Sequence, residues 1–130
     1  MSLDEPICLV AHDPRWSELA AAERRRISHV LGLSIDSVEH IGSTAVPHLI
    51  AKPIIDLIVG VAVYPPPQLL TEQMVSLKYE ALGEAGVPER LYFRRRGAEA
   101  FNAHVVLNGG THWRTAIEIR EHLKSDPAER

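Results

Sequence analysis

The sequence predicts an α+β fold in which helices pack on a small mixed β-sheet. Three observations support this prediction: amphipathic helical patterns near both ends of the chain, an apolar strand pattern in the middle, and two further strand patterns after it. The predicted order is helix, strand, strand, helix, two strands and helix. With 130 residues and no long linker, we expect residues 1–130 to form a single domain with one core.

The first helix is predicted to follow Asp13-Pro14, which offers a capping side chain and a proline suited to a first turn. Apolar residues with helical spacing run from Trp16 to Leu31, and Gly32 is a natural stop. A short strand over residues 37–41 is expected next. It ends in the sequence Gly-Ser-Thr at 42–44, which predicts a sharp turn.

The second predicted strand, residues 54–61, is a β-branched apolar run interrupted by Asp56. Such a run is typical of a strand that is buried on both faces. Because burial penalises an ionised carboxylate, Asp56 requires a cation, a metal ion or several hydrogen-bond donors. Two interpretations stay open: a buried ion pair, with Lys52 or an arginine of a neighbouring strand, and a functional site.

The remaining elements follow from turn signals and periodicity. Prolines at 65–67 precede a helical pattern that extends to Leu77 and is expected to begin at Pro66 or Pro67. Residues 90–95 and 101–107 are predicted to form an antiparallel hairpin around Gly97. Thr111 is expected to cap a last helix, which Pro127 would close.

Composition and charge exclude several classes of protein. Hydrophobic residues make up 45% of the chain and charged residues 24%, as in an ordinary globular domain. The formal charge of −3 argues against a long nucleic acid as partner and still allows a small anionic ligand. The single cysteine, Cys8, excludes an internal disulfide. With no apolar run of membrane-spanning length and an acidic start, we expect a cytoplasmic protein that does not enter a membrane.

Two segments near the second strand are candidates for binding phosphate. Gly42-Ser43 leaves a strand and presents backbone N–H groups together with a hydroxyl, although such a pair is more often a plain turn with a cap. Lys52 precedes the strand of Asp56 and could be an edge residue or a cation that faces the phosphate. In the hairpin, alternation sends Arg94 and Arg96 to one face, so Arg94 is a further candidate.

Residues 40–47 (HIGSTAVP) and 51–59 (AKPIIDLIV) closely resemble the GrpB family, whose members look like minimal nucleotidyltransferases of the DNA polymerase β superfamily. Later segments follow in the order and spacing of that family, so the resemblance covers nearly the whole chain. It implies a minimal nucleotidyltransferase-like mixed sheet with helices packed on it. It places Gly42 and Ser43 at the phosphate-binding turn and Asp56 at the first carboxylate of the metal-binding strand.

The chain departs from the superfamily pattern at two places. Active members carry a second acid two residues after the first, on the same face of the strand, where this chain has Ile58. Strand 101–107 offers Asn102 and His104 on one face and no acid. We expect Asp56 and His104 to approach each other across adjacent strands. They are the candidate catalytic residues and the candidate ligands of a divalent metal (Mg, Mn or Zn); alternatively, His104 orients Asp56 by a hydrogen bond.

Three functions remain open from the sequence. The first is transfer of a nucleotidyl group from a nucleoside triphosphate to an unknown acceptor. The second is a catalytically degenerate domain that binds a nucleotide or a phosphorylated small molecule, which the missing second acid favours. The third is a protein-interaction domain, since the resemblance extends to domains fused to dephospho-CoA kinase. A homo-oligomer is a further expectation, because the chain stops soon after Pro127 and could leave an apolar surface for a second copy.

Overall fold

The computed structural model describes residues 8–125. Its helices are α1 (Arg15–Leu31), α2 (Gln68–Ser76) and α3 (Thr111–Ser125), with two three-residue 3-10 helices, η1 (Ile35–Ser37) and η2 (Ser43–Ala45). Its strands are β1 (Val38–Ile41), β2 (Ile55–Val61), β3 (Glu80–Ala81), β4 (Leu91–Arg95) and β5 (Phe101–Leu107). The predicted α+β class is confirmed.

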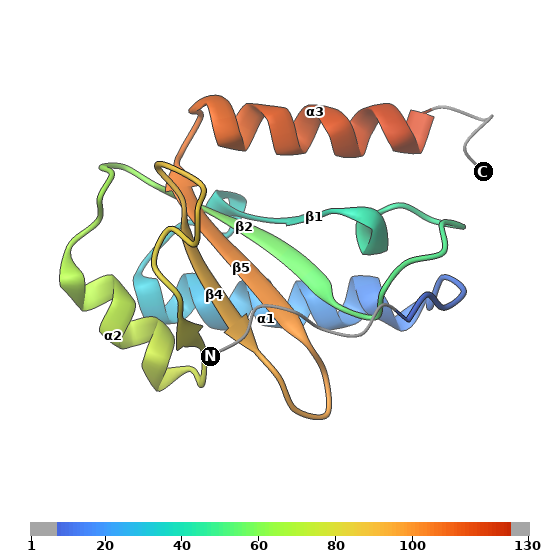
Figure 1. The fold of residues 1–130 in the computed structure, drawn as a ribbon, viewed down its shortest axis with the longest axis horizontal. Helices are drawn as coiled ribbons and strands as arrows, with labels where there is room; N and C mark the ends of the chain where they lie inside the picture. Colours follow the sequence, from blue (N-terminus) through green and yellow to red (C-terminus); the bar gives the residue numbers. More distant parts are fainter. Residues whose placement is uncertain (1–7, 126–130) are drawn as a thin grey trace.

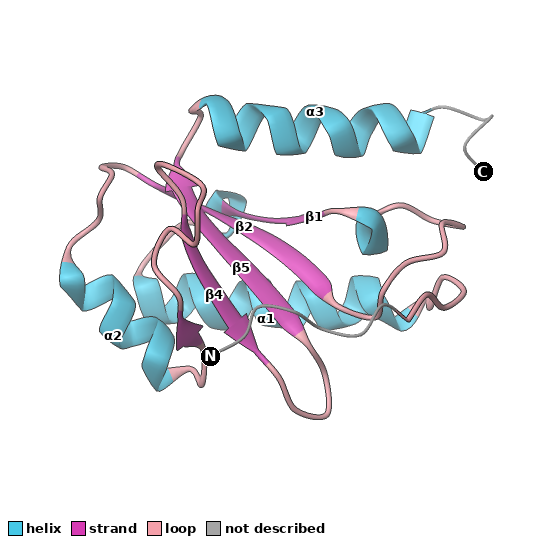
Figure 2. Cartoon of the chain, viewed as in Figure 1, coloured by secondary structure: helices cyan, strands magenta, loops and turns pink. Residues whose placement is uncertain are grey.

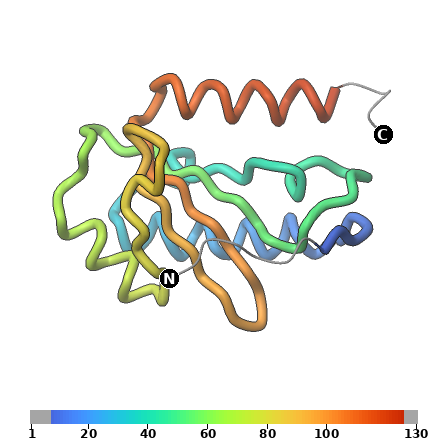
Figure 3. Tube along the Cα trace, in the orientation of Figure 1, coloured from blue at the N-terminus to red at the C-terminus, as the bar shows by residue number. Residues whose placement is uncertain are grey.

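The five strands form one mixed sheet in the order β1-β2-β5-β4-β3 (Figure 2). The central pair, β2 and β5, is parallel, and the other three neighbouring pairs are antiparallel. A parallel pair requires a crossover, and the chain supplies it with the segment that contains α2, β3 and β4. The predicted hairpin of β4 and β5 is confirmed, and Figure 3 shows its turn reaching beyond the neighbouring strands.

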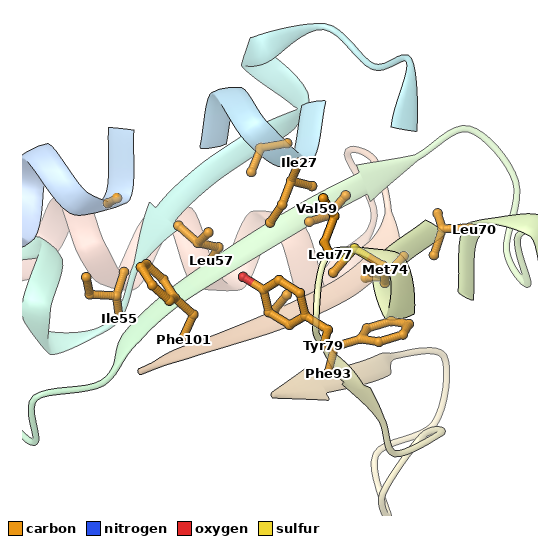
Figure 4. Packing of buried hydrophobic residues seen from close by; sticks show 14 of the residues in the cluster. Ile27, Ile55, Leu57, Val59, Leu70, Met74, Leu77, Tyr79, Phe93 and Phe101 are labelled. Atoms are coloured by element: carbon orange, nitrogen blue, oxygen red, sulfur yellow. The ribbon is translucent and has the colours of Figure 1, made fainter. Parts of the chain in front are cut away.

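One face of the sheet carries the main core beneath α1 and α2. Alternate residues of β2 and β5, among them Leu57, Val59 and Val105, are fully buried there against Ile27 of α1 and Met74 of α2. Figure 4 shows this packing, with the aromatic rings of Tyr79, Phe93 and Phe101 joining the aliphatic residues. Burial of this apolar surface is the main stabilising contribution to the fold.

The opposite face of the sheet is covered in part by α3, which lies on the other side of the sheet from α1 (Figure 1). A second, smaller cluster forms there from Ile41, Ile58 and Val106, and α3 packs on it with Trp113 and Ile117 among other residues. Farther along the same face, β2 and β5 carry Asp56, Asn102 and His104. The apolar part of this face is therefore beneath α3, and the polar part lies beside it.

The predicted elements agree with the structure apart from details at their ends. The second helix begins at Gln68, directly after Pro67, and the short strand begins at Val38 because η1 precedes it. The two-residue strand β3 was not predicted. Gly42 is followed by the short η2 and not by an α-helix. Pro127 lies outside the described residues.

Candidate functional site

Asp56 is the centre of the polar part of the sheet. Its register partners are Ile41 on β1 and Asn102 on β5. Asn102 Nδ2 donates a hydrogen bond to Asp56 Oδ1 at 3.0 Å, and His104 Nε2 lies 3.2 Å from the same oxygen. The Asp56 carboxylate therefore has two side-chain hydrogen-bond partners. These partners explain how a carboxylate is tolerated in an apolar strand without an ion pair to a buried lysine. The predicted approach of Asp56 and His104 across adjacent strands is confirmed.

Gly42 lies directly against Asp56 from the end of β1. Its backbone has φ 76° and ψ −174°, a conformation that is essentially restricted to glycine. A Cβ atom at this position would be 3.1 Å from Asp56 Oδ2 and 3.3 Å from Asp56 Cβ. Glycine is therefore required here for two reasons, the backbone conformation and the close approach of the carboxylate.

The turn after Gly42 leaves donors available. The Ala45 N–H donates to the Gly42 carbonyl and the Val46 N–H donates to the Ser43 carbonyl, so these bonds do not involve the N–H groups of Ser43 and Thr44. Since η2 has only three residues, it has no long helix dipole to attract an anion. Any anion bound here would be held by N–H and hydroxyl groups of the turn and by neighbouring cations.

A polar hollow of about 240 Å³ opens beside Asp56. It brings together three predicted site residues, Ser43, Lys52 and Asp56, and it is also lined by Thr44, Ala51, Ile54, Tyr92 and Asn102. Lys52 is exposed, and the Asp56 side chain is 31% exposed, so both are accessible to a ligand. The hollow is bounded by three separate segments of the chain: the turn after β1, the approach to β2, and the strands themselves.

Three predicted site residues, Gly42, His104 and Arg94, are not among the described residues that line the hollow. Gly42 and His104 still contact Asp56, whereas Arg94 is held elsewhere. Arg94 shares the sheet face of Asp56, as the alternation predicted, because its register partner is Asn102. Its guanidinium pairs with Glu80, at 3.4 Å between Nη2 and Oε1, and Arg94 is absent from the described residues that line the hollow. Arg95 points to the opposite face, where it pairs with Glu23.

Two residues of the site, Arg90 and Tyr92, were missed by sequence reasoning, and Arg96 was considered only for the face that it shares with Arg94. The ring of Tyr92 stacks on the ring of His104, with centroids 5.3 Å apart. Arg90 Nη1 lies 3.3 Å from His104 Nδ1, and Arg96 Nη2 donates to Asn102 Oδ1 at 3.0 Å. Alternation along β4 could have indicated that Arg90 and Tyr92 share a face, but the strand that faces them could not be inferred from spacing alone.

His40 precedes the turn and forms part of its support. Its Nε2 lies 2.8 Å from Thr44 Oγ1. Burial lowers the pKa of His40 to about 4, with the negative charge of Asp56 opposing this shift in part and Arg120 and Arg24 adding to it. His40 is therefore neutral at physiological pH and can hold Thr44 by a hydrogen bond.

The divalent metal that was expected finds few ligands in this arrangement. Among residues 8–125, no group of three or more His, Cys, Asp or Glu side chains is placed to hold an ion. Asp56 and His104 alone are too few for zinc, which ordinarily takes three or four protein ligands. Mg²⁺ or Mn²⁺ would have the Asp56 carboxylate and whatever phosphate oxygens a ligand brings. The described side chains do not complete the coordination of an ion by themselves, so a metal site that uses Asp56 and His104 stays a prediction.

The fold and the site together define a class of α+β protein, in which a five-stranded mixed sheet carries a single carboxylate, held by an amide and an imidazole, next to a glycine turn and a polar hollow. The chain belongs to the GrpB family: residues 6–130 match the family model described as GrpB protein. In the described part of the chain, no helix combines the length and hydrophobicity needed to span a membrane.

Relatives with known sequences or structures agree with this assignment. The chain is 36% identical over 124 residues to a UPF0157 protein of Streptomyces coelicolor, and 30% identical over 120 residues to one of Bacillus subtilis. It covers 64% of the first of these relatives and 35% of the second, so it spans only part of their length. The crystal structure of the conserved protein GrpB from Enterococcus faecalis has a TM-score of 0.82 and 31% identity, covering 93% of this chain and 74% of that one.

Proposed function

We propose that this chain binds a nucleoside triphosphate or another phosphorylated ligand in the hollow beside Asp56, on a sheet of the nucleotidyltransferase-like type. The observation that carries the proposal is the convergence of Ser43, Lys52 and Asp56 on one accessible hollow from separate segments. Lys52 supplies a cation for a phosphate group. Ser43 supplies a hydroxyl and, with Thr44, backbone N–H donors.

The size of the hollow supports a phosphate group as the part of the ligand that is held. At about 240 Å³ it is smaller than the range of roughly 300–1,000 Å³ typical of pockets that enclose a whole small molecule. A nucleoside attached to the phosphate would therefore extend beyond the hollow. This arrangement suits recognition of the phosphate with little selection among bases.

The surroundings of Ile58 favour binding without two-metal catalysis. Ile58 occupies the position at which the superfamily pattern has a second acid, and it is 2% exposed in the cluster beneath α3. Neither a metal ion nor a ligand has access to that position while α3 is in place. Nucleotidyl transfer to an unknown acceptor would have to proceed with Asp56 as the only carboxylate, so we propose ligand binding as the principal function.

Calorimetry tests this proposal with ATP and inorganic phosphate, each in the presence of Mg²⁺ and separately with a chelator. We expect Lys52→Ala to weaken binding about tenfold, or about 1.4 kcal/mol, because it removes the cation at the hollow. The matched control is Lys124→Ala, which removes an exposed lysine of α3. Equal affinities for the two variants, or no heat with either compound under both conditions, would contradict the proposal.

A further inference from the structure

The ring of His104 has its two nitrogens in different surroundings. Nδ1 lies 3.3 Å from Arg90 Nη1, and Nε2 lies 3.2 Å from Asp56 Oδ1. Arginine carries only donors, whereas an ionised carboxylate carries only acceptors. The contact with Arg90 therefore requires a lone pair on Nδ1, and the contact with Asp56 requires the proton on Nε2. A doubly protonated ring would direct an N–H group at the guanidinium.

Arg90 is itself held firmly in this position. Its Nη2 donates to the Glu84 carbonyl at 3.0 Å, and its guanidinium lies 4.7 Å from the centre of the Tyr92 ring. The same ring stacks on His104. Arg90, Tyr92 and His104 thus form a packed unit in which His104 presents Nε2 to Asp56.

As a result, the two carboxylate oxygens of Asp56 differ in their hydrogen bonds. Both hydrogen bonds from Asn102 and His104 end at Oδ1, while Oδ2 lies beside Gly42. An Nε2–H group can donate to Asp56 but cannot accept a proton or bind a metal ion through that nitrogen.

We propose that Arg90 is a positioning residue, which fixes His104 as the Nε2–H tautomer so that His104 and Asn102 occupy Oδ1 and leave Oδ2 to accept a hydrogen bond from a hydroxyl group of the ligand. The part of this inference that concerns the ligand rests on the proposed function. The tautomer itself does not, and it can be measured on the protein without any ligand.

Nitrogen NMR of the histidine rings at about pH 8 measures the tautomer, with the His104 signals assigned by comparison with His104→Gln. We expect a single Nε2–H tautomer in the wild type and in Arg90→Lys, which keeps a cationic donor. Arg90→Met keeps an apolar stem without a donor, and we expect it to show a mixture of tautomers. The matched control, Arg25→Met on an exposed part of α1, should resemble the wild type. An Nδ1–H tautomer in the wild type would overturn the proposal.

Binding of ATP or inorganic phosphate then tests whether the tautomer matters for the ligand. We expect Arg90→Met to weaken binding about fivefold to tenfold and Arg90→Lys to restore most of the loss. In the His104→Gln background, which has no tautomers but keeps an amide donor, Arg90→Met should have no further effect. An equal loss in both backgrounds would overturn the positioning role. No binding by the wild type, with the tautomer as expected, would refute the proposed function and leave the Arg90–His104 assignment standing.

Discussion

At the scale of single residues, the site depends on a close contact between a glycine and a carboxylate. Gly42 and Asp56 lie at the ends of neighbouring strands. Because Gly42 has no side chain, Oδ2 of Asp56 can lie close to its backbone. A residue with a positive φ that also faces a charged group has two independent constraints. Their effects on stability can be separated by comparison with a glycine that has only one of them.

We predict that Gly42→Ala lowers the free energy of unfolding by about 2–4 kcal/mol, since the strained backbone costs about 1–3 kcal/mol and the Cβ atom displaces Asp56. Urea denaturation measures the loss. The control is Gly83→Ala, where φ is 63° and a Cβ atom would meet nothing within 4 Å. That variant should lose only about 1 kcal/mol. Equal losses at the two positions would show that the contact with Asp56 contributes nothing.

His40 allows a prediction about pH. Its pKa is about 4 in the folded protein, below the ordinary value of 6.5, so the unfolded chain takes up a proton before the folded protein does. Stability from this residue is present above pH 6.5 and decreases as the pH falls toward 4. Between pH 7 and pH 5 we expect a loss of about 2 kcal/mol. In His40→Gln this portion of the pH dependence should be absent. It should persist in His29→Gln, which alters an exposed histidine; an unchanged slope in His40→Gln would contradict the assignment.

Some residues of the site could be predicted from the sequence, and others could not, because their contacts depend on how the strands pair. Asp56 and His104 were identified because a charge in an apolar strand and the two-residue period of a strand are both visible in the sequence. Arg90 and Tyr92 were not identified, since their contacts with His104 depend on the register of β4 against β5. Arg94 was placed on the correct face, but its pairing with Glu80 depends on β3, which is too short to predict.

At the scale of elements, α3 divides its face of the sheet into a covered apolar part and an open polar part. Its apolar side packs on Ile58, and Arg120 anchors it to β1 through Glu39, at 2.7 Å between Nη1 and Oε1. The helix was predicted from its periodicity, but its position over Ile58 was not. That position gives a physical reason why an acid two residues after Asp56 would not be tolerated here.

We therefore predict that Ile58→Asp, which adds a second acid on the face of Asp56, destabilises the protein by about 3–5 kcal/mol, because it places an unpaired carboxylate beneath α3. Chemical denaturation provides the measurement, and Ile58→Val, with an expected cost of about 1 kcal/mol, is the control for volume. If the Ile58→Asp protein were stable and bound Mg²⁺ in calorimetry, this prediction would be wrong. The result would show that α3 can move away from position 58 and that two acids on this face are enough to bind the ion.

At the scale of the whole molecule, one buried charge connects segments that are far apart in the sequence. Glu23 of α1 is 4% exposed, and it accepts a hydrogen bond from the Tyr79 hydroxyl at 2.6 Å. It also pairs with Arg26 at 2.9 Å and with Arg95 of β4 at 3.1 Å. Burial raises the pKa of Glu23, but these partners outweigh it, and the pKa is lowered overall. The cluster thus joins α1 to β4 on the core face of the sheet as an ion-pair network, although Arg95 Nε is buried there with no hydrogen-bond partner among the described residues.

We predict that Tyr79→Phe costs about 1–3 kcal/mol of unfolding free energy, because Glu23 loses a donor inside the core while its charge remains. The loss should be smaller in acid. Because the pKa of Glu23 is lowered, its contribution to stability is present near neutrality and disappears as the pH falls through that pKa.

Tyr64→Phe is the control, since the Tyr64 hydroxyl donates to Glu84 at 2.8 Å on the surface, where water can replace it. We expect a loss below about 0.5 kcal/mol for that variant. Equal losses in urea titrations of the two variants would mean that the Glu23 cluster is no stronger than a surface hydrogen bond, and that apolar packing alone holds α1 to the sheet.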